Sequence, residues 1–187
     1  MTNSKSVVTV QMARPHLRRL PDRELPEGFS VRWYDTGDDA TWVRIHRQSG
    51  GYPDFDGQEF LRSFGGYTEE LARRLCFIRD PDGRDIATAT AWFGDEDPGR
   101  EWGRIHWVAM VENMHGKGLA KPLMGIVLHR LSHLEHRRAY LVTQSFRIPA
   151  IRLYLSCGFM PRVLGDEDRR EWDRLRASGM PIPPAAE

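Results

Sequence analysis

The feature that most constrains this chain is a glycine-rich turn between an extended apolar run and a long amphipathic pattern. The run ends near Val111, and the pattern continues to about Leu134. The first amides of a helix have no partner inside it, and the helix dipole places partial positive charge there. In the turn, Gly116 and Gly118 carry no side chain that would keep an anion away. The sequence therefore predicts an anion site at the N-terminus of a central helix.

The spacing of this turn disfavours two common phosphate-binding loops. A Walker loop has four residues between its glycines and then Lys followed by Ser or Thr. Here Lys117 lies between the glycines and no hydroxyl follows. A dinucleotide-binding fingerprint has a third small residue three positions after its second glycine. That position is Lys121, so an interpretation as a nucleoside-triphosphatase fails and a dinucleotide site is weakly supported.

The turn resembles the acetyl-CoA-binding loop of the GCN5-related N-acetyltransferase (GNAT) family, written Q/R-x-x-G-x-G/A. Asn113 occupies the Gln/Arg position, and residues 115–120, His-Gly-Lys-Gly-Leu-Ala, are close to the family's common Arg-Gly-Lys-Gly-Ile-Gly form. Residues 150–159, Ala-Ile-Arg-Leu-Tyr-Leu-Ser-Cys-Gly-Phe, fit the family's A-x-x-L-Y-x-x-x-G-F segment. Arg147 stands where the family usually has Asn. The two matches lie at the family's spacing, and the strand order around them agrees.

Apolar periodicity and turn residues predict alternating strands and helices. Strands are expected at 29–34, 75–78, 85–93, 102–111, 139–143 and 159–164, and helices at 40–48, 58–64, 68–74, 119–134, 149–157 and 166–177. This order, with a hairpin turn at 80–83, indicates an α+β or α/β mixed sheet. The resemblance narrows the expectation to a GNAT-like six- to seven-stranded mixed, splayed sheet flanked by about four helices.

Three segments are expected along the chain. Residues 1–28 are rich in Arg and Pro and lack a period, so they are predicted to form an extended arm without regular structure. Residues 29–165 would form the GNAT-like domain. Residues 166–187 would form a polar helix and a frayed tail.

Composition excludes several classes of partner. The chain has 27 basic and 26 acidic residues, the basic ones are scattered, and no apolar stretch is long enough to span a bilayer. We therefore expect neither nucleic acid nor a membrane as a partner. The N-terminus lacks the pattern of a secretory signal, and Cys76 and Cys157 suit free thiols in a reducing compartment. A cytoplasmic protein is expected, and a homodimer is the assembly considered beside the monomer.

The resemblance implies direct attack of an amine on the thioester of acetyl-CoA, with Tyr154 as the general acid near the sulfur. It also implies that the strand before the turn offers backbone groups to the pantetheine, that the amides of the turn hold the diphosphate, and that Lys117 pairs with charge at the rim. The residues expected to bind acetyl-CoA are Val108, Met110, His115, Gly116, Lys117, Gly118, Leu119, Ala120 and Arg147. The alternative for Tyr154 is a core tyrosine on an amphipathic helix.

The general base is less well marked. The family often has a Glu on the strand before the loop, and that position falls at about Arg104. His106 lies two residues further, on the same face of the strand, and its ordinary pKa suits proton removal near neutrality. Packing beside Trp107 is the alternative role for His106. Glu112 is a third candidate for the general base. Its alternative is a position that simply faces solvent.

The acceptor is expected between the first helices and the splayed strands. Tyr52, Asp54 and Asp56 are the candidates for its walls, because two carboxylates beside aromatic rings could receive a cationic amine. A solvated turn is the competing interpretation. The histidines at 129, 133 and 136 share one helical face, but no acidic or cysteine partner has metal-site spacing, so no metal is expected.

The resemblance of both motifs to the GNAT family implies an acetyl-CoA-dependent N-acetyltransferase that acts on a primary amine of a small molecule or protein. A non-catalytic acyl-CoA-binding sensor on the same fold is the alternative, because the family's Glu is missing and Arg147 replaces its Asn. The identity of the acceptor and the length of acyl chain accepted are not encoded in these motifs.

Overall fold

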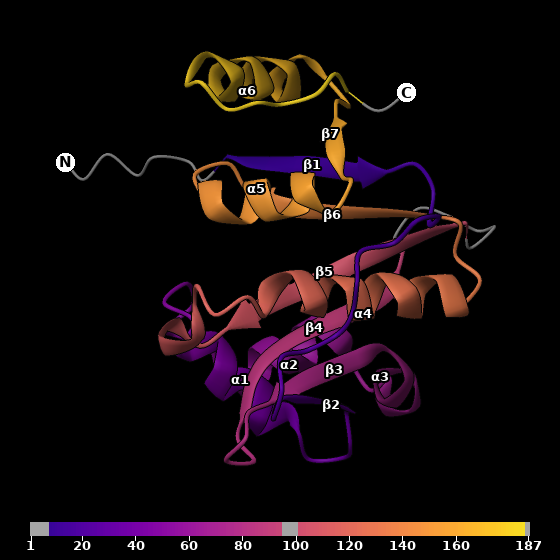
Figure 1. The fold of residues 1–187 in the computed structure, drawn as a ribbon, viewed down its shortest axis with the longest axis vertical. Helices are drawn as coiled ribbons and strands as arrows, with labels where there is room; N and C mark the ends of the chain where they lie inside the picture. The colour runs from indigo at the N-terminus through magenta and orange to yellow at the C-terminus, as the bar shows by residue number, and fades with distance from the viewer. Residues whose placement is uncertain (1–7, 95–100, 186–187) are drawn as a thin grey trace.

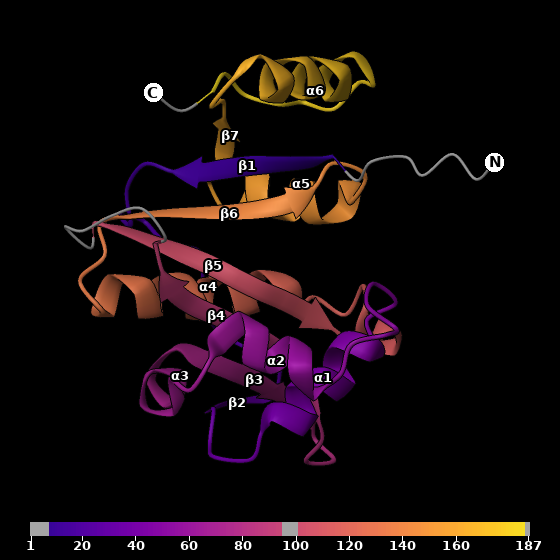
Figure 2. The same ribbon diagram turned by 180° about the vertical axis from the view of Figure 1, so that it is seen from behind.

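The structure, a computed structural model, describes residues 8–94 and 101–185. These residues form one seven-stranded sheet in the order β2-β3-β4-β5-β6-β1-β7, six α-helices and a short 3-10 helix (Figures 1 and 2). The strands are β1 (Thr9–Arg14), β2 (Ser30–Trp33), β3 (Leu75–Arg79), β4 (Asp85–Phe93), β5 (Trp102–Met110), β6 (Arg138–Gln144) and β7 (Met160–Arg162). The helices are α1 (Asp39–Arg47), α2 (Gly57–Phe64), α3 (Thr68–Arg74), η1 (Glu112–Met114), α4 (Ala120–His133), α5 (Ile148–Ser156) and α6 (Asp166–Ala177).

The mixed, open sheet confirms the predicted fold class, and each predicted element from residue 29 onward is present within a few residues. Only β5 and β6 run parallel; the other neighbouring strands are antiparallel. Six α-helices accompany the sheet in the described ranges, at the six positions that periodicity indicated. Cys76 and Cys157 are free and buried, as predicted.

The prediction of an arm without regular structure is wrong for residues 9–14. They form β1, which pairs antiparallel with β6 along its full length and with β7 on its other side. Val10 and Met12 are buried in the core. Val10 and Met12 alternate with Thr9 and Gln11, but the stretch is short, and its backbone groups are satisfied by strands 125 or more residues away. Residues 15–28 contain no helix or strand, as predicted.

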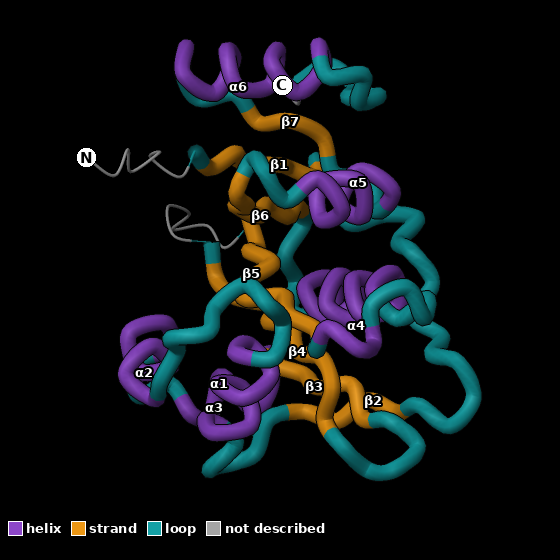
Figure 3. Tube along the Cα trace, turned by 90° about the vertical axis from the view of Figure 1, so that its left-hand side faces the viewer, coloured by secondary structure: helices purple, strands orange, loops and turns teal. Residues whose placement is uncertain are grey.

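The sheet separates two layers of helices (Figure 3). Helices α1, α2 and α3 cover one face, and α4 and α5 cover the other. The predicted apolar stripe of α4 is buried, because Leu123, Val127 and Leu131 are each at most 1% exposed. The segment that leads to β2 crosses α4 closely, since a Cβ at Gly125 would lie 2.2 Å from the carbonyl oxygen of Asp22. None of the helices in the described ranges is long and apolar enough to cross a membrane.

The sheet opens between β5 and β6. The two strands pair only where Trp102–Arg104 meets Arg138–Tyr140, and their ribbons separate beyond that point (Figure 1). On its other side, β5 carries a bulge: the register jumps from Thr88↔Ala109 to Thr90↔His106, and Trp107 has a φ of +50°. The fold thus leaves a notch in the middle of the sheet, beside the end of the strand that leads into the glycine turn.

Candidate active site

The glycine turn joins β5 to α4 through the single 3-10 turn η1. Gly116 and Gly118 both have a φ of +77°, a conformation that strains residues with a Cβ. Apart from the adjoining residues, no atom of the described chain lies within 4 Å of a Cβ built on either glycine. The backbone conformation therefore requires both glycines, and the space beside them is open to a ligand.

The backbone amides of this turn lack partners. In the described ranges, the amides of residues 116–121 donate no hydrogen bond to another described residue. Helix α4 begins at Ala120, and its first turn contains no acidic side chain. The helix dipole adds partial positive charge, and Lys117 and Lys121 are exposed nearby. The turn therefore offers a site for an anion such as a diphosphate.

The amide of His115 differs from these, since it donates to the carbonyl of Glu112 at 3.0 Å. The imidazole Nε2 of His115 also lies 3.0 Å from the carbonyl oxygen of Met110. His115 therefore closes the turn against the end of β5, and its amide is not among the unpaired donors that the sequence predicted.

A cleft of about 280 Å³ occupies the opening between β5 and β6. Side chains from β1, the loop between α1 and α2, β5, β6 and α5 meet around it. The lining residues are Thr9, Tyr52, Arg104, Ile105, His106, Trp107, Val108, Leu141, Val142, Thr143, Gln144, Arg147 and Tyr154. The cleft thus brings together five of the residues singled out from the sequence: Tyr52, His106, Val108, Arg147 and Tyr154.

Tyr154 projects from α5 into this cleft and is 8% exposed. Burial raises the pKa of its hydroxyl to about 12, and the nearby charge of Arg147 partly opposes that rise. The hydroxyl is therefore protonated at neutral pH. A protonated hydroxyl in a partly enclosed cleft can donate its proton to a leaving group.

A known protein family matches most of the chain. Residues 18–159 match the family model described as "Acetyltransferase (GNAT) family". This match covers well over half of the chain. The chain belongs to the GNAT family of acetyltransferases.

Two curated proteins similar to this GNAT acetyltransferase are named mycothiol acetyltransferase. The one from Thermomonospora curvata is 28% identical over 166 residues, which cover 81% of this chain and 51% of that protein. The one from a Nocardioides species is 27% identical, over 79% of this chain and 55% of that protein. The chain spans about half the length of the curated relatives it matches.

Solved structures show the same fold. A GCN5-related N-acetyltransferase from Sphaerobacter thermophilus superposes with a TM-score of 0.66 at 23% identity, covering 82% of this chain and 48% of that one. A spermidine N-acetyltransferase from Vibrio cholerae, solved with CoA and spermine, gives a TM-score of 0.56 at 17% identity, over 70% of this chain and 80% of that one.

His106 of this GNAT acetyltransferase lies in the cleft, and it also packs in the aromatic core. Its ring centroid is 5.3 Å from that of Trp107 and 5.9 Å from that of Phe64. Burial, with smaller contributions from the charges of Arg104 and His46, lowers the pKa of His106 to about 3. The imidazole is therefore neutral at physiological pH and can accept a proton, but it is a weak base.

The three residues predicted for the acceptor lie in different surroundings. Tyr52 lines the cleft. Asp56 is the N-cap of α2, where its Oδ1 accepts hydrogen bonds from the amides of Gln58 and Glu59 at 3.0 and 3.2 Å. Asp54 is exposed and does not line the cleft. The structure therefore brings the aromatic candidate to the notch, and neither of the two carboxylates lines it.

Arg147 lies at the mouth of the cleft, immediately before α5. Its Nε donates to Oε1 of Gln144 at 2.7 Å, and its guanidinium carbon lies 4.7 Å from the ring centroid of Tyr52. These contacts join the end of β6 to the loop between α1 and α2. If Arg147 binds CoA, as the sequence predicts, it does so from this position beside Gln144 and Tyr52.

The aromatic cluster behind the cleft was not expected from the sequence. Trp107 makes near-perpendicular ring contacts with Trp42, His46 and Phe55, at centroid distances between 5.3 and 5.6 Å. The density of aromatic residues between 42 and 64 was a signal for such a cluster. The positive φ that turns Trp107 toward these rings has no counterpart in the sequence, because it arises from the register shift between β4 and β5.

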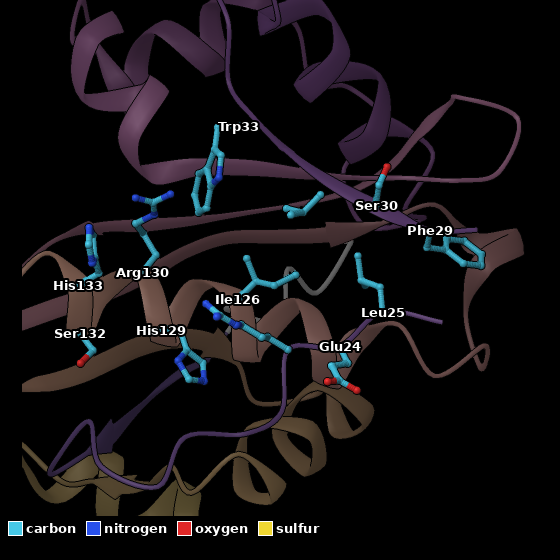
Figure 4. A pocket seen from close by; sticks show the side chains of 12 residues that line it. Glu24, Leu25, Phe29, Ser30, Trp33, Ile126, His129, Arg130, Ser132 and His133 are labelled. Carbon is cyan, nitrogen blue, oxygen red and sulfur yellow. The ribbon is translucent and has the colours of Figure 1, made fainter. Parts of the chain in front are cut away.

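The three histidines predicted to share one helical face do not converge on one point, because α4 ends at His133 and His136 lies beyond it. His129 and His133 line an open groove of about 970 Å³ between α4 and β2, where Arg130 stacks 3.7 Å above the ring of Trp33 (Figure 4). His136 is buried elsewhere, with its Nε2 3.4 Å from Nη1 of Arg74. In the described part of the chain, no three His, Cys, Asp or Glu side chains are grouped as metal ligands.

Proposed function

We propose that this protein is an acetyl-CoA-dependent N-acetyltransferase that acetylates a primary amine by direct attack on the thioester. One observation carries the proposal: the unpaired amides at the head of α4 follow directly from the strand whose open side forms the cleft containing Tyr154. A diphosphate and a reactive thioester joined by an extended arm fit such an arrangement. The family's use of acetyl-CoA supports it.

The chain's residues fit this co-substrate. Unpaired amides, the dipole of α4 and two exposed lysines favour the diphosphate at residues 116–121. Because of the bulge, Trp107 and Val108 have no register partner on β4. Their backbone groups are therefore candidates to hydrogen-bond the pantetheine arm, as expected for Val108. Acetyl-CoA supplies the activated acetyl group.

The reaction requires two proton transfers, one to the departing sulfur and one from the amine. The acceptor nitrogen forms a bond to the carbonyl carbon of the thioester, and the carbon–sulfur bond breaks. Tyr154, whose hydroxyl is protonated at neutral pH, gives its proton to the departing sulfur. The proton lost by the amine passes to water or to His106, which lines the same cleft and is neutral but a weak base.

Two measurements test the proposal. Isothermal titration calorimetry with acetyl-CoA should give binding at micromolar concentration, and thiol release should appear when amines are added. The panel should contain amino acids, their amides, spermidine and mycothiol-related amines, because the relatives' names include mycothiol and spermidine. Binding without thiol release from any amine would instead support a non-catalytic acyl-CoA sensor.

A further inference from the structure

The charges that line the cleft are of one sign. Arg104 and Arg147 both contribute to its wall, and His106 is neutral. Among the described residues, those that line the cleft include no Asp or Glu. A polyamine or other polycation would therefore meet the charge of Arg147 and no carboxylate among the described residues of this wall, which is unfavourable for binding.

Arg147 is oriented with its terminal nitrogens available. Only Nε has a hydrogen-bond acceptor among the described residues, the side chain of Gln144. The face of the guanidinium rests on Tyr52, which limits its rotation. Nη1 and Nη2 form no hydrogen bond to another described residue. A planar pair of donors held in this way matches the two oxygens of a carboxylate.

The neighbours of Arg147 place it on the acceptor side. Besides Tyr52 it approaches Gly51, where an added Cβ would lie 2.5 Å from Nη2. Both residues belong to the loop between α1 and α2. The charge of Arg147 also acts on Tyr154 and on His46 of α1. No hydrogen bond or stacking contact joins Arg147 to residues 113–121, within the described part of the chain.

We propose that the acceptor of this enzyme is a small amino carboxylate, and that Arg147, stacked on Tyr52, binds its carboxylate group. This inference rests on the proposed acetyltransferase function and names its substrate class. Arg147 would then determine acceptor specificity instead of binding CoA. The cleft volume of about 280 Å³ suits a small acceptor, in which only a few bonds separate the carboxylate from the amine.

Matched acceptors test the substrate class. Thiol release from acetyl-CoA should be measured with several amino acids, each beside its amide and its decarboxylated amine, and with spermidine. The expected result is a kcat/KM at least about tenfold higher for the carboxylate member of each set, because the charged hydrogen bonds to Arg147 are lost in the other members. Equal or better turnover of the amides or of spermidine would overturn the inference while leaving the acetyltransferase function intact.

Variants test the role of Arg147. Arg147→Gln should raise KM for the amino carboxylate at least about tenfold and leave both its KM for acetyl-CoA and its turnover of the matched amide within about twofold. Gly51→Ala keeps the charge of Arg147, but the added Cβ displaces its guanidinium. This variant should therefore raise KM for the amino carboxylate by a smaller factor than Arg147→Gln does. Arg152→Gln removes an exposed arginine from α5. It should change neither the KM for the amino carboxylate nor the KM for acetyl-CoA.

The outcomes separate the two levels of inference. If Arg147→Gln raises KM for acetyl-CoA and spares the acceptor, Arg147 binds the cofactor and the further inference is wrong. If the folded wild-type protein binds acetyl-CoA but releases no thiol with any amine, the proposed function itself fails, and the acceptor class fails with it. Circular dichroism of each variant excludes loss of folding as the cause.

Discussion

Burial determines the chemistry of the hydroxyl of Tyr154. Because its pKa is raised to about 12, the side chain holds its proton until the sulfur leaves. We predict that Tyr154→Phe lowers kcat for thiol release by about 10²-fold, a usual loss for a general acid. The dissociation constant of acetyl-CoA, measured by calorimetry, should change little. An unchanged kcat would show that Tyr154 only packs against its neighbours.

Two buried histidines predict a dependence of stability on pH. In the folded chain the pKa of His46 is lowered to about 4 and that of His106 to about 3, mainly by burial. Below pH 6.5 the unfolded chain binds protons that the folded chain does not. The free energy of unfolding should therefore be highest above pH 6.5 and fall toward pH 4, by about 1.4 kcal/mol per pH unit for each histidine.

Urea unfolding at several pH values checks this slope. His46→Gln should reduce the slope between pH 6.5 and 4, whatever its effect on absolute stability. His133→Gln, at an exposed position on α4, should leave the slope unchanged. Identical slopes in the wild type and in His46→Gln would contradict the buried, neutral state of His46.

At the scale of elements, the turn between β5 and α4 depends on its two glycines. Gly118→Ala places a Cβ on a residue with a φ of +77°, which costs about 1–2 kcal/mol or forces the backbone to move. Because the amides of the turn would move too, acetyl-CoA affinity should fall about tenfold or more, as measured by calorimetry. Gly165→Ala is the control, since its φ of −166° suits any residue and no atom crowds it. Equal affinities in the two variants would argue against the anion site.

At the scale of the whole molecule, β1 joins the two ends of the chain in one sheet. Met12 lies on β1 between the strands β6 and β7 and is fully buried. Met12→Ala should therefore reduce the free energy of unfolding by about 2–5 kcal/mol. Val31→Ala, on the edge strand β2 at a position 40% exposed, should cost much less. Chemical denaturation measures both. A negligible effect of Met12→Ala would show that residues 9–14 do not belong to the sheet.

The sequence alone determined the features that depend on local chemistry. Apolar periodicity located α4 and the strands on either side of it, and the glycines at 116 and 118 marked a turn with open amides. The spacing between that turn and the segment containing Tyr154 indicated the family. Each of these signals lies within a short stretch of chain, so no distant contact was needed to interpret it.

Only the tertiary structure decided which distant residues share a site. The strand β1 is six residues long and its partners lie at the far end of the sequence, so its place in the sheet depends on contacts that no local pattern shows. Asp56 was plausible as a substrate ligand until its carboxylate was found to cap α2. His106 had a suitable ordinary pKa until packing among aromatic rings lowered it. Burial, charge and cleft composition depend on contacts between remote segments, and those contacts form only when the chain folds.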